Sequence, residues 1–293
     1  MNSFVIGLIF ISTFMHAGWN LLSRFHHAER RFYEKMLQIT VVVGFIPAVW
    51  SELVTRSMTP LAWGCVVGAG VCAGLYLFFL GRAYEAADFS VVYPVARSLP
   101  VIFVAFGDVL RGRFLTTVGW IGILLVAAGC ILVPQRSLNE MRLQNYFNKA
   151  SLWMLLAALG TVGYTLLDKI AAEVIKQGPA TAARYCYFYF ALSYIPYAIL
   201  LKFFKPERES STSKEWMMAG IATVFGFGAY WLVLWAYQLS PYAGYIVAFR
   251  QFSIVIGAVL AFIIYKEGGI KVRLSGALMI TAGLVLIAGW GQT

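Results

Sequence analysis

Ten long apolar stretches follow one another along this chain, with only short polar connections between them. A helix needs about 20 consecutive apolar residues to cross a membrane, and each stretch reaches or exceeds that length. The stretches cover residues 3–22, 35–54, 60–81, 89–110, 114–134, 150–170, 179–204, 216–239, 242–265 and 270–290. We therefore expect an all-α membrane protein with ten transmembrane helices.

The composition excludes the soluble classes of protein. Of the 293 residues, 60% are hydrophobic and 12% are charged, whereas a soluble domain has roughly 25% charged residues. The four cysteines lie in apolar stretches without Cys-x-x-Cys spacing, so we expect no metal and no other cofactor. The chain also lacks the sequence motifs of zinc proteases, P-loop proteins and serine hydrolases. We therefore expect that it is not an enzyme.

Lys and Arg are distributed unevenly among the connections. Fifteen of the 23 lie in or beside connections one, three, five, seven and nine, and five lie in the other four. No basic face accompanies the net charge of +10, so we expect no nucleic-acid partner. Cytoplasmic loops of membrane proteins carry the excess of Lys and Arg. The bias therefore predicts that the odd-numbered connections face the cytoplasm and that both termini face outward.

The two halves of the chain carry similar sequences in the same order. Residues 16–24, which begin His-Ala-Gly-Trp-Asn, match residues 161–169, which begin Thr-Val-Gly-Tyr-Thr. A second pair of matching segments, residues 95–97 and 248–250, ends at Arg97 and at Arg250. Further matches pair Phe45-Ile-Pro47 with Tyr194-Ile-Pro196, Ala83-Tyr84 with Ala236-Tyr237, and Gly122 and Gly129 with Gly276 and Gly283. Five matches in order indicate an internal repeat.

An odd number of helices in each repeat makes the two copies cross the membrane in opposite directions. We expect a first five-helix repeat over residues 1–134, a linker over residues 135–149 and a second repeat over residues 150–293. Inverted repeats of this kind are typical of secondary transporters, whose substrate site lies near mid-membrane where the halves meet.

The chain resembles the drug/metabolite transporter superfamily, EamA type, over nearly its whole length. The resemblance rests on the His16-Ala-Gly-Trp-Asn20 start, on Tyr93-Pro-Val-Ala-Arg97 and on Tyr265-Lys-Glu267. It implies a secondary carrier in the cell membrane, commonly a bacterial inner-membrane exporter of amino acids or other small metabolites. Members usually have a Glu before the last helix of each half; Glu267 fits, but Arg113 stands at the first place. Many members have cytoplasmic termini, against the charge bias.

Arg97 and Arg250 are the strongest candidate binding residues. Arg97 lies about nine residues into its stretch, roughly 13 Å deep at 1.5 Å per residue, and Arg250 is its counterpart in the repeat. Charges at this depth are costly and usually functional. Guanidinium groups bind carboxylate or phosphate in bidentate fashion, which predicts an anionic or zwitterionic substrate. The alternative is that both bond carbonyls freed by nearby prolines such as Pro94 and Pro100.

Five further residues are candidates for the wall of the substrate site. A histidine in an apolar helix can titrate and couple transport to protons; the alternative is that it packs helices together by hydrogen bonds. Arg184, at the start of its stretch, either lines the cavity or extends to the membrane interface. The five are His16, Trp19, Asn20, Tyr164 (the repeat counterpart of Trp19) and Arg184.

Together these features predict an exporter of a small anionic or zwitterionic metabolite, such as an amino acid, that works by alternating access. The expected partners are this substrate, the lipid bilayer and protons as the coupling ion, with exchange as the alternative. The protein is expected as a monomer or homodimer. Three other functions stay open: a flippase for lipid-linked precursors, an exporter of cationic drugs and a membrane scaffold that transports nothing.

The predicted orientation can be measured with a reporter fused to the C-terminus. Because the Lys and Arg bias places both termini outside, alkaline phosphatase fused there should be active, since it folds only outside the cytoplasm. A fluorescent protein that matures only in the cytoplasm should stay dark at the same position. The reverse pattern would overturn this orientation.

Overall fold

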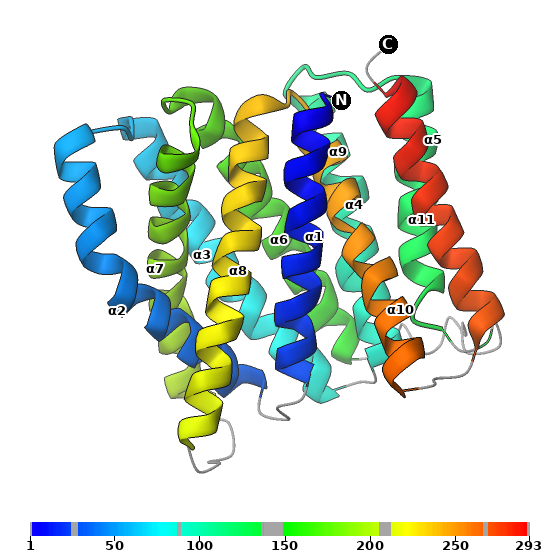
Figure 1. Ribbon diagram of the computed structural model, residues 1–293, viewed down its shortest axis with the longest axis horizontal. Helices are drawn as coiled ribbons and strands as arrows, with labels where there is room; N and C mark the ends of the chain where they lie inside the picture. The colour runs from blue at the N-terminus through cyan, green and yellow to red at the C-terminus, as the bar shows by residue number, and fades with distance from the viewer. Residues whose placement is uncertain are drawn as a thin grey trace.

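The computed structural model describes residues 2–24, 29–86, 89–135, 137, 149–204, 212–265 and 269–291. The regular elements in these ranges are all α-helices (Figure 1). They are α1 (Ser3–Arg24), α2 (Glu29–Thr55), α3 (Pro60–Ala86), α4 (Phe89–Leu110), α5 (Thr117–Leu132), α6 (Lys149–Val174), α7 (Pro179–Phe203), α8 (Ser213–Leu239), α9 (Ala243–Arg250), α10 (Phe252–Tyr265) and α11 (Ile270–Trp290).

The predicted class, an all-α membrane protein, is confirmed. Eight described segments are long and apolar enough to cross a membrane, and one of them joins α9 to the start of α10. With α4 and the shorter α5, they form one helical bundle. Large apolar side chains such as Val42, Ile46 and Leu278 are exposed on its outer face. In a bilayer these side chains contact lipid instead of water.

α2, α3 and α6 extend four to six residues beyond one end of their predicted ranges. Two other helices differ from the prediction for local reasons. The ninth stretch is divided at Gln251, whose N–H bonds the carbonyls of Ala248 and Phe249; Phe252 then begins α10. The fifth helix is shorter than expected because Thr116 caps its start, accepting a bond from the Gly119 N–H at 3.0 Å. Hydrophobicity continues through both places, so the sequence pattern did not reveal either feature.

The two halves pack against each other in a pattern that a pseudo-twofold relation would produce. α3 packs closely on α6, and their expected counterparts α8 and α1 pack on each other in the same way. α2 packs on its counterpart α7, and α5 on its counterpart α11. Both termini lie at one end of the bundle (Figure 1), so α1 starts from that end and α6 from the opposite one. The inverted repeat stays a prediction, and this arrangement supports it.

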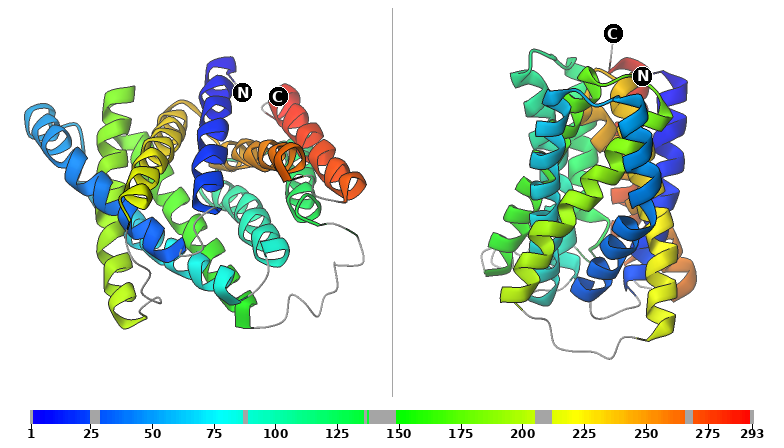
Figure 2. Two further views of the ribbon diagram at one scale, coloured as in Figure 1. Left: turned by 60° about the horizontal axis from the view of Figure 1, so that its bottom comes forward. Right: turned by 90° about the vertical axis from the view of Figure 1, so that its left-hand side faces the viewer.

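α2 lies at one edge of the bundle and the pair α5 and α11 at the opposite edge, with the other helices between them (Figures 1 and 2). The four glycines matched by the repeat explain how closely α5 and α11 approach. A Cβ added at Gly129 would lie 2.6 Å from the carbonyl oxygen of Gly276, and one at Gly122 would lie 2.8 Å from that of Gly283. Small residues at such crossings let helix backbones touch in membranes.

This crossing should be intolerant of a single added methyl group. We expect Gly129→Ala to destabilise the protein by roughly 1–3 kcal/mol, because the new Cβ overlaps the backbone of α11. Gly64→Ala is the matched control, since a Cβ there meets nothing within 4 Å; it should be neutral or stabilising by up to about 1 kcal/mol. Thermal unfolding of the detergent-purified variants measures both. Equal melting temperatures for the two would contradict the close crossing.

Candidate functional site

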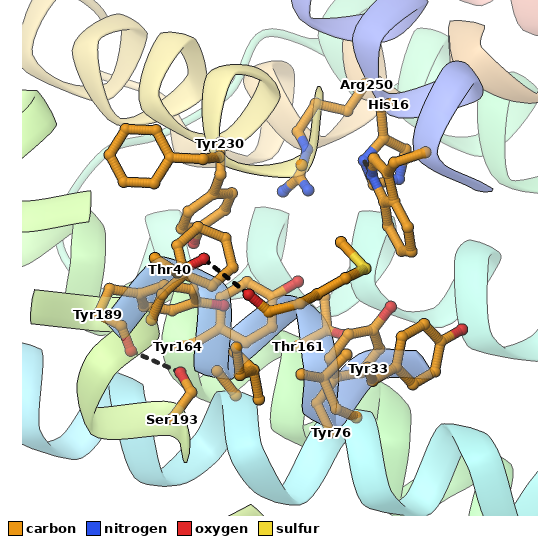
Figure 3. Close-up of a pocket in the computed structure, with 18 of the residues that line it drawn as sticks. His16, Tyr33, Thr40, Tyr76, Thr161, Tyr164, Tyr189, Ser193, Tyr230 and Arg250 are labelled. Carbon is orange, nitrogen blue, oxygen red and sulfur yellow. Dashed lines mark hydrogen bonds between the residues drawn. The ribbon is translucent and has the colours of Figure 1, made fainter. Parts of the chain in front are cut away.

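A cavity lies between the two halves of the bundle (Figure 3). The space among its lining side chains, with the open solvent at its mouth included, is about 990 Å³. Each half supplies twelve lining residues: His16, Trp19, Tyr33, Met36, Leu37, Thr40, Ala73, Tyr76, Leu77, Ala96, Arg97 and Pro100 from the first, and Thr161, Tyr164, Tyr189, Phe190, Ser193, Thr223, Gly226, Phe227, Tyr230, Val247, Arg250 and Gln251 from the second.

His16 connects α1 to Arg97 of α4. Its Nδ1 lies 2.9 Å from the indole N–H of Trp19, and its Nε2 lies 2.7 Å from Nη2 of Arg97. Both neighbours are donors only, and a neutral imidazole accepts at one nitrogen. A protonated imidazole would face a donor on both sides. A neutral imidazole can therefore accept from only one of the two neighbours and a protonated imidazole from neither, so the geometry disfavours a second proton on His16.

Arg250 is the last residue of α9 and points into the cavity at the place where the ninth crossing is interrupted. Its side chain is buried, and its guanidinium carbon lies 5.4 Å from the ring centroid of Tyr230. An aromatic face stabilises a cation without neutralising it. Among the described carboxylates, none lies within ion-pair distance of this guanidinium. Figure 3 shows the guanidinium between Tyr230 and His16.

A cluster of tyrosines forms the wall next to Arg250. Tyr164 of α6 lies at its centre, with ring centroids 5.8 Å from Tyr76, 5.7 Å from Tyr189 and 5.9 Å from Tyr230. The four rings come from α3, α6, α7 and α8. They surround the cavity with aromatic faces and with hydroxyl groups that both donate and accept hydrogen bonds.

The structure brings together five of the seven residues predicted from the sequence: His16, Trp19, Arg97, Tyr164 and Arg250 all line the cavity. Asn20 is not among the lining residues. Its side-chain amide donates to the backbone carbonyl of His16 at 2.7 Å, one turn earlier in α1. Its position is explained by bonding within the helix, and we leave it out of the proposed binding group.

Arg184 lies away from the cavity, in a polar contact between α7 and the end of α2. It bonds the hydroxyl oxygens of Ser51 and Ser57 at 2.9 Å and 3.0 Å, and its Nε lies 3.3 Å from a carboxylate oxygen of Glu52. Arg184 is not among the cavity-lining residues, and its place near the start of α7 leaves the alternative at the membrane interface open. We therefore also leave Arg184 out of the binding group.

A buried carboxylate that the sequence pattern did not reveal lies behind the cavity wall. Asp168 of α6 is fully buried and accepts hydrogen bonds from the hydroxyls of Tyr185, at 2.8 Å, and Tyr230. The available signal was an Asp inside the sixth apolar stretch, next to Lys169. Both were near enough to the end of that stretch to be taken for its polar boundary. Elsewhere in the described ranges, no group of three or more His, Cys, Asp or Glu side chains could hold a metal ion.

Comparison with known proteins identifies the family. Residues 148–289 match the sequence model of the EamA-like transporter family. The second half of the chain is an EamA-like transporter domain. The resemblance to the EamA type of the drug/metabolite transporter superfamily is thereby confirmed over residues 148–289, and the apolar helices indicate a multi-pass membrane protein. The family is one of transporters and not of enzymes. Glu267, the family feature noted in the second repeat, lies outside the described residues.

Solved structures extend the likeness of fold to the whole chain. No functionally curated protein matches the sequence. Of the 27 solved chains that match, one crystal structure of a protein has a TM-score of 0.73 at 16% identity, and the alignment covers 99% of both chains. At 16% identity, this match shows that the two chains share a fold, and it says nothing about a substrate.

The buried pair of Arg184 and Glu52 should matter for stability and not for binding. Arg184→Gln leaves the Glu52 carboxylate without its cation, which should destabilise the protein by roughly 3–5 kcal/mol. Adding Glu52→Gln removes the uncompensated charge and should recover part of that loss. Thermal unfolding of the two single variants and the double variant measures the coupling. Additive losses would show that the two side chains do not act as a pair.

Proposed function

We propose that this protein exports a small anionic or zwitterionic metabolite, such as an amino acid, across the bacterial inner membrane by alternating access. The observation that carries the proposal is one arginine from each half in a shared cavity. A substrate that is held by both halves stays bound while the halves move relative to each other.

The lining chemistry favours an anionic group on the substrate. Arg97 and Arg250 supply the charge, and the described lining contains no Asp or Glu to neutralise it. A carboxylate or phosphate would bind the two guanidiniums in bidentate fashion. The ammonium group of a zwitterion would lie against the tyrosine rings, which attract cations. Hydroxyls of Thr40 and Thr161 add hydrogen-bonding groups.

The helices at the site have the interruptions that movement needs. Arg250 lies where α9 ends and α10 begins, and discontinuous helices are common at the binding sites of transporters. Pro47 and Pro196 lie inside α2 and α7, the expected counterparts of one another. A proline removes one backbone hydrogen bond and lets a helix bend. These features support a rocking motion of the two halves.

The other candidate functions fit the cavity less well. Two guanidiniums in the cavity lining would repel a cationic drug. A scaffold that transports nothing gains no advantage from the cost of burying them. A flippase for lipid-linked precursors would use the same arginines for a phosphate. Overexpression separates this last case, because a flippase should give cells no protection against a toxic concentration of a soluble metabolite.

Two arginine substitutions test the proposed site. A thermal-shift screen against amino acids, phosphonates and sugar phosphates first identifies a metabolite that stabilises the purified protein. Arg97→Gln and Arg250→Gln should each weaken its apparent affinity in proteoliposomes by at least about tenfold, which corresponds to about 1.4 kcal/mol for a lost charge-assisted contact. The transport rate as a function of metabolite concentration measures this change.

Arg82→Gln is the matched control for these variants. Arg82 lies at the end of α3, outside the lining, near Glu85 and over the ring of Trp153. It removes the same charge from the protein and should leave the affinity unchanged. If both cavity variants transport with wild-type rate and affinity, the arginines do not hold the substrate and the proposal is wrong.

A further inference from the structure

Asp168 lies directly behind the wall of the cavity. It follows Thr161 and Tyr164 at spacings of seven and four residues, so the three side chains share one face of α6. Thr161 and Tyr164 line the cavity, while Asp168 is completely buried one turn further along the helix. The carboxylate is therefore separated from the cavity by a single layer of side chains.

Tyr230 forms the connection between this carboxylate and Arg250. Its hydroxyl donates to one carboxylate oxygen of Asp168, and Tyr185 donates to the other at 2.8 Å. The ring of the same Tyr230 lies under the guanidinium of Arg250, at 5.4 Å. One tyrosine thus contacts the buried anion with its hydroxyl and the buried cation with its face.

Among the described residues of the neighbouring helices, Arg250 is the only charged group that interacts electrostatically with Asp168. No Lys, Arg or His there lies within ion-pair distance of the carboxylate. The adjacent Lys169 is directed away from Asp168, to the carbonyls of Tyr237 and Ser240 and to Glu173. Asp108 of α4 and Arg111, which follows α4, interact with Lys169. The other titratable groups that interact with Asp168 are neutral: Cys65 and Cys72 on α3, Tyr185, Cys186 and Tyr189 on α7, and Tyr230 and Tyr237 on α8.

We propose that Asp168 binds a proton when an anionic substrate occupies Arg250, and that this linkage couples transport to protons. This inference rests on the proposed function of the same cavity. A buried carboxylate is costly without a compensating charge, and here Arg250 supplies that charge through Tyr230. A bound anion neutralises Arg250, so the carboxylate then takes up a proton. The new carboxyl O–H donates to a tyrosine oxygen, which accepts as well as donates.

The linkage is reciprocal. If a bound anion favours the proton on Asp168, then the proton on Asp168 favours the bound anion by the same factor. The apparent affinity for the substrate therefore rises as the pH falls. Each anion that leaves the cell takes one proton with it, so this part of the transport carries no net charge. Export then runs down the outward gradient of the substrate, because the inward proton gradient opposes it. The proton moves on Asp168 and not on His16, whose two ring nitrogens both face donors.

Infrared difference spectroscopy of the full-length protein in lipid tests the linkage without any substrate. The signal is the carbonyl band of a protonated carboxyl group, followed as the pH is lowered. Asp168→Asn should lose this band. Arg250→Gln imitates neutralisation by an anion and should show a larger band than the wild type at the same neutral pH. Arg82→Gln removes a charge beside Trp153, near the start of α6 and 15 residues before Asp168 in the sequence, and should match the wild type.

Two results would overturn the inference: an unchanged band in Asp168→Asn, or an equal band in Arg250→Gln and the wild type. Tyr230→Phe provides the test if Asp168→Asn fails to fold, because it removes one hydroxyl donor and keeps the ring under Arg250. It should increase the band at neutral pH, and an unchanged band would again overturn the inference. The transport measurements on Arg97 and Arg250 report separately on the proposed substrate site.

Discussion

Holding two guanidinium groups inside a lipid-embedded bundle, Arg250 buried and Arg97 half-buried, is the constraint on which the interior depends. Each costs roughly 2.5–3.5 kcal/mol on insertion scales. The protein offsets this cost with acceptors and aromatic faces, namely His16 for Arg97 and Tyr230 for Arg250. A carboxylate at either place would stabilise the arginine more strongly, but it would also occupy the position that an anion needs. The cavity lining is therefore mostly aromatic and apolar, and its positive charge is concentrated at Arg97 and Arg250.

The rest of the bundle treats its cations differently. Arg184 pairs with Glu52, Lys35 with Glu215 and Arg30 with Glu85, each joining two helices. At the end of the bundle that holds the termini, the ammonium of Lys169 bonds the last carbonyls of α8, and Asp108 accepts the Gly244 N–H at 2.7 Å. These contacts fasten α4, α6, α8 and α9 together there. A state that opens at this end requires them to break.

Charge in an apolar stretch identified the cavity arginines Arg97 and Arg250, but it did not identify the role of Arg184. Arg97 and Arg250 were identified because they lie deep in apolar stretches and match each other in the repeat. Arg184 also lies in an apolar stretch, but near its start, and its carboxylate partner, Glu52, is supplied by another helix far away in the sequence. Asp168 was overlooked because its tyrosine partners on α7 and α8 are equally distant. In each case, the side chain that lies opposite the charged group distinguishes a proposed binding residue from a structural one.

The sequence by itself determined the membrane class, the approximate limits of ten helices and the presence of two deep arginines. These are properties of hydrophobicity and spacing along a single segment, which the bilayer imposes locally. Only the tertiary structure decided which polar groups face each other, where the ninth crossing is interrupted and which residues share a cavity. A buried polar group takes its role from the donor or acceptor opposite it, and helix packing brings that partner from a remote part of the chain.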